Sequence, residues 1–199
     1  MRHGAVEEDT AFRSDPPLSV AGRAQAVALA ERLRDVHFDR CLVSPRVRAQ
    51  ETASALLTGR KLAAETHACL AEGAFGALDG VDRDEARRRW PEFFRLGRTV
   101  LARLAATGMT APGGETRAEF LARADSAHAL VRESLFAPQA RALVVSHGGL
   151  LHLLLARLLG HEPRDEASYG FANCGVARVV AYSEPPEYGP FAMLMSSSP

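Results

Sequence analysis

The chain has 199 residues, a formal net charge of +0 and an apolar fraction of 47%. This length suits one domain over residues 1–199, and the balanced charge argues against a nucleic-acid partner or an anionic membrane surface. The three cysteines lie far apart and form no CxxC pair, which indicates a reducing compartment rather than a disulfide or zinc framework. Since no apolar run is long enough to span a bilayer, we expect a cytoplasmic protein.

The first part of the chain alternates a helix, a strand and a second helix. Apolar residues recur at helical spacing over 19–36, which predicts an amphipathic helix. The run RCLVS at 40–44 is typical of a short buried strand. Ser44 and Pro45 then offer an N-cap and a first-turn proline for a helix that ends at Leu57.

The middle of the chain is predicted to be an insertion. A short strand is expected at 61–66, followed by a loop that is punctuated by glycine. Charged helical patterns follow around 82–94 and 96–106. We therefore expect segment 73–112 to form a helical cap over the functional site.

The last part of the chain repeats the alternation of helix and strand. A long helix is expected at 116–136, a buried strand (RALVVS) at 141–146, and an apolar helix at 150–159. A final strand is expected at 175–182, and the Ser- and Pro-containing tail at 183–199 is expected to be frayed. Strands that alternate with helices favour an α/β fold, a three-layer sandwich with a mostly parallel central sheet flanked by helices.

Two strand ends carry residues that suit an anionic ligand. The segments 44–48 and 146–149 each follow a predicted strand and lead into a helix N-terminus. Open parallel sheets bind ligands at the carboxyl ends of their strands, and helix N-termini favour anions. Arg48 and His147 therefore predict a phosphate-sized pocket, which Arg2-His3-Gly4 would complete from a third strand end.

This set of residues can carry out a two-step phosphoryl transfer. A neutral histidine is a competent nucleophile, arginines hold the phosphoryl oxygens, and a carboxylic acid protonates the leaving oxygen. Glu72, which opens the glycine-rich loop, is a candidate for that acid. Taken alone, each residue also has a structural interpretation, because most histidines are not catalytic and Arg48 suits a solvated helix face.

The sequence lacks the motifs of several other catalytic chemistries. It contains no GxSxG elbow, no HExxH motif and no complete P-loop. His147 and His152 are five residues apart, which is the wrong spacing for two ligands on one helical face. The sequence therefore predicts neither a metal site nor a bound cofactor.

Six motifs occur in a fixed order along most of the chain. They are RHG at 2–4, DPPLSVAGRAQA at 15–26, VSPRVRAQETA at 43–53, LAEGAFGALDG at 70–80, PGGET at 112–116 and LVVSHGG at 143–149. In this order they resemble the histidine phosphatase superfamily, in its phosphoglycerate-mutase-like branch. The resemblance extends from residue 2 to about residue 180 and implies the α/β sandwich described above.

The resemblance implies a role for each matching residue. His3 would be the phosphorylated nucleophile, with Arg2 beside it as a phosphate ligand. Arg48 matches the arginine of the family's SPxxRA pattern, and His147 matches the second pocket histidine, which donates to the phosphoryl oxygens. Glu72 matches the family's general acid and base. The family needs no metal, which agrees with the missing metal motifs.

The sequence departs from the family at several places, among them the absence of the Asn common in the loop after RHG and the short length of that loop before Leu18-Ser19. Family members carry an apolar strand before RHG, whereas this sequence has only Met1 there, so the first strand is expected to be missing. The Thr or Ser that often follows the RHG glycine at the second position is Val6. Arg46 stands where the SPxxRA pattern usually has an apolar residue.

The sequence favours a phosphomonoester hydrolase that acts on a small phosphorylated metabolite through a phosphohistidine on His3, with Glu72 as general acid and base. One alternative is a cofactor-dependent phosphoglycerate mutase, which shares the pocket residues; the compact segment 72–147 favours hydrolysis. Another is a truncated or non-catalytic relative that binds phosphorylated ligands. The expected partner is a small phosphorylated substrate, without nucleic acid or membrane, and a homodimer is left open.

Overall fold

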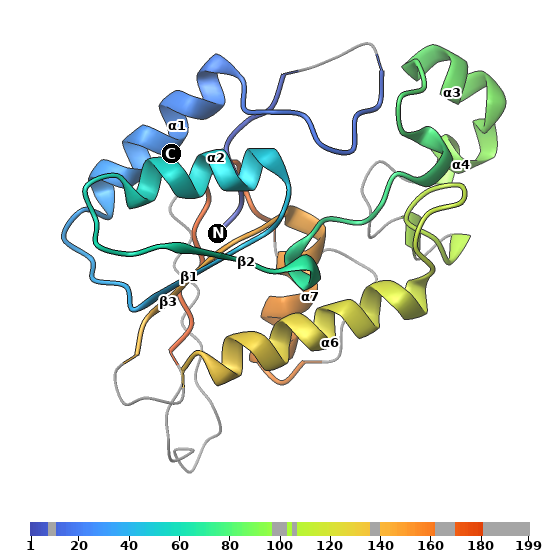
Figure 1. Cartoon of the computed structure of the whole chain (residues 1–199). Helices are drawn as coiled ribbons and strands as arrows, with labels where there is room; N and C mark the ends of the chain where they lie inside the picture. Colours follow the sequence, from blue (N-terminus) through green and yellow to red (C-terminus); the bar gives the residue numbers. More distant parts are fainter. Residues whose placement is uncertain (8–10, 97–102, 105–106, 136–139, 162–169, 181–199) are drawn as a thin grey trace.

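The computed structural model describes residues 1–7, 11–96, 103–104, 107–135, 140–161 and 170–180. Within these ranges the chain forms three layers, in which a parallel sheet lies between two groups of helices (Figure 1). This arrangement is the α/β sandwich expected from the sequence. Over the same ranges, no helix combines the length and the hydropathy needed to cross a membrane.

The described part of the sheet has short parallel strands in the order β2-β1-β3. They are β1 (Arg40–Val43), β2 (Ala64–Thr66) and β3 (Ala142–Val145). β1 is central, and its Cys41 lies opposite Ala64 of β2 and Leu143 of β3. Because the strands are parallel, the loops that follow them meet at one edge of the sheet.

Side chains of the strands point alternately into two apolar cores. The helices that cover the sheet are α1 (Val20–Arg32), α2 (Val47–Leu57), α6 (Arg117–Glu133) and α7 (Gly148–Leu158). Cys41 and Val43 are buried in a cluster with α1 and α2, whereas Leu42 is buried in a cluster with α6 and α7. Figure 1 shows these two helix pairs on opposite faces of the sheet. Burial on both faces explains the continuous apolar runs in β1 and β3.

Polar side chains determine where two of these helices begin. Ser19 caps α1, because its hydroxyl accepts the Gly22 N–H at 3.0 Å. Thr116 and Glu119 form a reciprocal capping box at the start of α6. The predicted starts of these two helices are confirmed.

The predicted start of α2 at Ser44-Pro45 is wrong. The helix begins at Val47, with Arg46 in the N-cap position and no side-chain hydrogen bond from it. The Ser44 hydroxyl instead lies 2.7 Å from His147 Nε2. The Val47 N–H is capped by Asp15, whose Oδ1 accepts it at 2.7 Å. Tertiary contacts thus override the local capping preference at this position.

The first three residues lie along β3 and extend the sheet. The Ser146 N–H donates to the Met1 carbonyl at 3.0 Å, and the His3 N–H donates to the Ser146 carbonyl at 3.1 Å. Two further backbone hydrogen bonds of 3.1 Å join this segment to residues 174–175. Residues 1–3 therefore take the position of a strand end, and they bring His3 to the edge where β1 and β3 end.

The strand expected at 175–182 does not form in residues 175–180, the described part of that range. The Arg2 N–H donates to the Gly175 carbonyl, and the next residue of the N-terminal segment bonds to the residue before Gly175, so the two backbones run antiparallel. Among the described residues, Gly175 is the last of this segment with a backbone hydrogen bond to the N-terminal segment.

A small cluster of short helices stands beyond the sheet (Figure 1). It contains α3 (Arg83–Arg89) and α4 (Pro91–Leu96), and the 3-10 turns η1 (Ala68–Leu70) and η2 (Gly76–Leu78) lead to it. Leu78, Ala86 and Phe93 are buried in a core of their own, against which Phe12 and Phe75 pack. The helical pattern expected over 82–94 is confirmed, with a break at Pro91, which cannot continue a helix from the preceding residues.

Two predictions concern segments that lie mainly or wholly outside the described residues. Most of the helix expected at 96–106, and the whole of the tail at 183–199, lie outside the described residues. The role of segment 73–112 as a cap over the site stays a prediction.

Candidate active site

The sheet edge brings together the residues that the sequence singled out. His3 ends the N-terminal segment beside β3, Arg48 lies in the first turn of α2 after β1, and His147 follows β3. Glu72 comes from the loop after β2 and η1. The parallel sheet gathers His3, Arg48 and His147, because each follows a strand or strand-like segment. Glu72 arrives instead on the loop after η1.

The His3 side chain is held in one tautomer. Its Nδ1 lies 2.6 Å from the Gly4 carbonyl oxygen, which can only accept a hydrogen bond, so Nδ1 carries the proton. The Arg48 Nε–H donates to His3 Nε2 at 3.1 Å, so Nε2 carries the lone pair. The ring is only 6% exposed, and this burial, together with the Arg48 charge, lowers the pKa of His3 to about 3. The imidazole is therefore neutral at physiological pH, with a lone pair on Nε2.

His147 lies beside His3 and is fully buried. The two ring centroids are 5.0 Å apart, and the Ser44 hydroxyl lies 2.7 Å from His147 Nε2. Burial, and then the charge of Arg48, lowers the pKa of His147 far below its ordinary value. The Ser44 oxygen also accepts the Arg46 N–H at 3.2 Å, so its own proton is available to His147 Nε2. When the Ser44 hydroxyl donates to Nε2, the ring proton lies on Nδ1.

Two guanidinium groups face the same space. Arg2 donates through one terminal nitrogen to the Phe171 carbonyl at 2.7 Å, and Arg48 donates to the Ser14 carbonyl at 2.9 Å. Burial lowers the pKa of both arginines, and the charge of Glu72 opposes that effect. Both remain cationic, because an arginine pKa is so high that burial does not deprotonate it in proteins.

Two buried donors of the site have no hydrogen-bond partner among the described residues. They are Arg2 Nε and His147 Nδ1. A buried polar group without a partner costs about 1–3 kcal/mol, so such groups call for an explanation. His147 packs beside the His3 ring and the charge of Arg2 acts on His3, so an oxygen-rich anion bound next to His3 is one explanation for both unpaired groups.

The Glu72 carboxylate sits at the N-terminus of α7. Its Oε2 accepts the Gly149 N–H at 3.1 Å, and its Oε1 accepts the Gly73 N–H at 3.1 Å. A Cβ atom at position 149 would lie 2.7 Å from Oε1, closer than any ordinary contact. Gly149 therefore leaves the space that the carboxylate occupies.

The comparisons with known proteins agree with this geometry. Residues 1–188 match the family described as the histidine phosphatase superfamily (branch 1). The chain belongs to this superfamily.

Members of the superfamily with different named activities are similar to this chain. The Yersinia pestis protein named "Probable phosphoglycerate mutase GpmB" is 30% identical over 191 residues, which cover 94% of this chain and 85% of that protein. The structure of mycobacterial glucosyl-3-phosphoglycerate phosphatase is 29% identical with a TM-score of 0.69, covering 87% of this chain and 84% of that one. The alpha-ribazole phosphatase structure from Shigella flexneri has a TM-score of 0.77 at 24% identity, covers 99% and 94% of the two chains, and supports the fold alone.

Sequence patterns alone did not identify two contributors to this superfamily site. Ser44 was interpreted as a helix cap, but it contacts His147, which lies more than a hundred residues further along the chain. Gly149 was noted as the last residue of the LVVSHGG motif, but its missing side chain makes room for Glu72. The second glycine after His147 was the signal in the sequence for this contribution.

Proposed function

We propose that the protein is a phosphomonoester hydrolase that acts on a small phosphorylated metabolite through a phosphohistidine on His3. The observation that carries this proposal is the tautomer of His3, whose Nε2 lone pair lies beside Arg48 and near the unpaired donors of Arg2 and His147. A nucleophile needs such a lone pair, and a phosphoryl group needs donors around it.

In the first step, the Nε2 lone pair of His3 attacks phosphorus, and the bond between phosphorus and the ester oxygen breaks. Glu72, in its protonated form, gives its proton to that oxygen, so an alcohol leaves. Arg2 and Arg48 offset the charge on the phosphoryl oxygens, and His147 Nδ1–H donates to one of them.

In the second step, a water molecule attacks the phosphohistidine. Glu72, now a carboxylate, accepts a proton from the water as the new bond to phosphorus forms. The bond between phosphorus and Nε2 breaks, inorganic phosphate leaves, and the neutral His3 is restored.

A phosphoglycerate mutase is the second candidate, and the 30% identity to GpmB of Yersinia pestis favours it. The similarity to mycobacterial glucosyl-3-phosphoglycerate phosphatase supports hydrolysis instead. A mutase returns the phosphoryl group from His3 to an acceptor hydroxyl rather than to water. Phosphate release and a coupled mutase assay, both measured on phosphoglycerate, separate the two reactions.

We also propose that catalysis needs no metal and takes place in the cytoplasm. Arg2 and Arg48 supply the positive charge at the phosphoryl group that a metal ion would otherwise provide. Activity should therefore be unchanged by EDTA. The described cysteines are free thiols, which supports a reducing compartment.

The decisive experiment replaces His3 with Ala. Phosphate release from a panel of sugar phosphates, phosphoglycerates and nucleotides should be lost, together with acid-labile labelling of the protein by substrate that carries radioactive phosphate. His37 provides the matched control, because it is an exposed histidine that contacts Asp39 on the surface. His37→Ala should retain both signals. Normal turnover in His3→Ala would overturn the proposal.

A further inference from the structure

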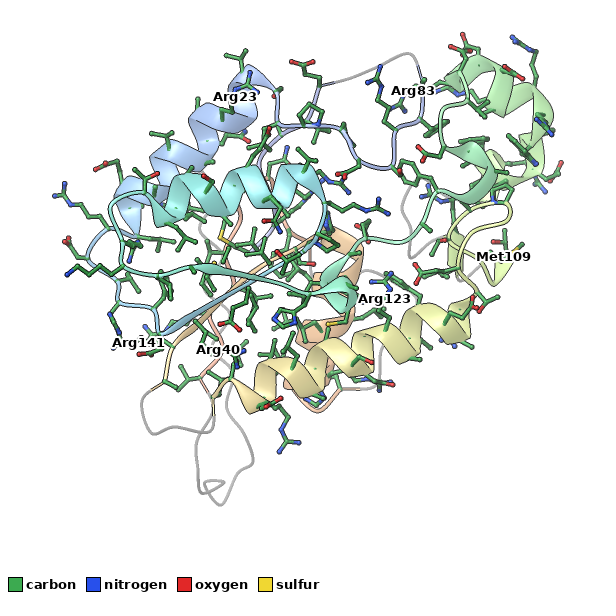
Figure 2. All side chains as sticks on the ribbon, in the orientation of Figure 1. Arg23, Arg40, Arg83, Met109, Arg123 and Arg141 are labelled. Carbon is green, nitrogen blue, oxygen red and sulfur yellow. The ribbon has the colours of Figure 1, made fainter. Side chains whose placement is uncertain are left out.

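The loop that carries Glu72 is tied to α6 by one arginine. Arg123 donates through one terminal nitrogen to the carbonyls of Cys69, at 3.3 Å, and Ala71, at 2.5 Å. Its other terminal nitrogen donates to the Glu72 carbonyl at 3.5 Å. Figure 2 shows Arg123 between α6 and the η1 turn. The backbone of the loop is therefore bound on the N-terminal side of Glu72 and at Glu72 itself.

Glu115 completes the attachment on the other side. The Arg123 guanidinium donates to both Glu115 oxygens, at 2.7 and 2.6 Å, in a bidentate pair. Glu115 Oε2 also accepts the Ala74 N–H at 3.2 Å, and the Thr110 hydroxyl donates to the Ala74 carbonyl at 2.8 Å. The two side chains thus hold the backbone both before and after Glu72.

The attachment is rigid, because its base is part of the apolar core. The Arg123 guanidinium carbon lies 4.8 Å from the centroid of the Phe120 ring, which is fully buried in α6. The side chains of Arg123 and Glu115 are only 17% and 21% exposed, so solvent weakens their pairing less than it would at the surface. These five hydrogen bonds use all five N–H donors of Arg123.

We infer that Arg123 and Glu115 are positioning residues that hold the Glu72 carboxylate where it protonates the leaving group. Among the described residues, the carboxylate accepts two hydrogen bonds, both from backbone N–H groups, and one of those comes from its own loop. Its position therefore depends on the backbone that Arg123 and Glu115 bind. This inference rests on the proposed role of Glu72 as general acid.

The test uses the leaving group of the substrate. An alkyl phosphate such as glycerol phosphate needs a proton on its leaving oxygen, whereas 2,4-dinitrophenyl phosphate has a leaving group that departs without one. Loss of general-acid catalysis costs roughly 10²–10⁴-fold. Glu72→Gln should therefore lower kcat/KM for the alkyl ester by about that factor and leave kcat/KM for the activated ester within a few-fold of wild type.

Arg123→Ala should show the same selectivity to a smaller degree. A misplacement of about 1 Å costs on the order of 10²-fold, so we expect that loss on glycerol phosphate and little loss on the activated ester. Arg123→Lys keeps the charge but not the planar fork, and it should recover part of the lost rate. Glu115→Gln should resemble Arg123→Lys.

The ratio of the two kcat/KM values, measured on one preparation, does not depend on the folded fraction, so partial misfolding does not obscure it. If Arg123→Ala is insoluble, the lysine and glutamine variants carry the same test. Asp125→Asn is the control, because it breaks an ion pair from α6 to Arg157 (2.7 Å) that does not touch the Glu72 loop. Both substrates should react with this variant as with wild type.

Each other outcome overturns the inference. Equal losses on both substrates in Arg123→Ala, with a selective loss in Glu72→Gln, would mean that Arg123 serves stability alone, and the proposed function would stand. An unselective Glu72→Gln would remove the acid role of Glu72, and the positioning inference with it. The His3→Ala experiment tests the nucleophile separately from both.

Discussion

Replacing Gly149 with Ala perturbs Glu72, the proposed general acid, without changing Glu72 itself. The added Cβ would lie 2.7 Å from Glu72 Oε1 and 3.4 Å from the carboxylate carbon, so the carboxylate must move by roughly 1 Å to reach an ordinary separation. Because the atom in the way ends a flexible side chain, the backbone can stay in place. A displacement of about 1 Å costs on the order of 10²-fold in rate. Alanine is also better than glycine within a helix by about 0.5–1 kcal/mol, so stability should not fall.

The assay measures kcat/KM on glycerol phosphate together with urea unfolding. Gly148→Ala is the matched control, because its Cβ would meet Arg2 Cδ at 3.9 Å, an ordinary contact. We expect a loss of about 100-fold in Gly149→Ala, a loss of less than about threefold in Gly148→Ala, and unchanged or higher stability in both. Wild-type kcat/KM in Gly149→Ala would refute the argument that Glu72 acts from its present position.

Three further predictions concern pH, phosphate binding and the core. The pKa of His3 is lowered to about 3 in the folded protein, whereas an unfolded histidine titrates near 6.5. Between these two values only the unfolded chain binds a proton at His3, so the free energy of unfolding falls as the pH drops below about 6.5. In urea unfolding, lowering the pH from 7 to 5 should reduce the free energy of unfolding of the wild type by about 2 kcal/mol more than that of His3→Asn. An equal pH dependence in the two proteins would contradict the assigned pKa. Arg48→Lys cannot bond to both His3 and Ser14, so kcat/KM should fall roughly 10–100-fold, and retained activity would mean that charge alone suffices. Leu42→Ala, at a fully buried position of β1, should lower the free energy of unfolding by about 2–5 kcal/mol, and a loss below about 1 kcal/mol would place Leu42 outside the core.

Much of the fold and most of the candidate site could be predicted from the sequence, because both depend on local patterns. Continuous apolar runs indicated β1 and β3. The rule that ligands bind at the carboxyl ends of parallel strands then predicted that Arg48 and His147 lie close together. The order of the six motifs added His3 and Glu72 to the predicted site. In the structure both residues lie at the same edge of the sheet as Arg48 and His147. The strand predictions needed only one short segment and a general rule, whereas the roles of His3 and Glu72 needed the order of motifs along most of the chain.

The remaining features depend on contacts between distant segments. The start of α2 was misplaced because Ser44 pairs with His147, which no local capping preference encodes. The strand at 175–182 was expected from its β-branched residues, but strand formation also needs a backbone partner, and residues 175–180 form no strand. Arg123 lies in a helix whose sequence is ordinary, and only the folded chain shows that it binds the Glu72 loop.

The N-terminal amine of Met1 has a practical consequence for anyone who prepares this protein. The amine is buried, donates to the Val144 carbonyl at 2.6 Å, and has a pKa lowered to about 5 by that burial. A purification tag fused in front of Met1 would therefore emerge from within the sheet, two residues from the proposed nucleophile, rather than from the surface. An affinity handle is therefore better kept away from this end of the chain.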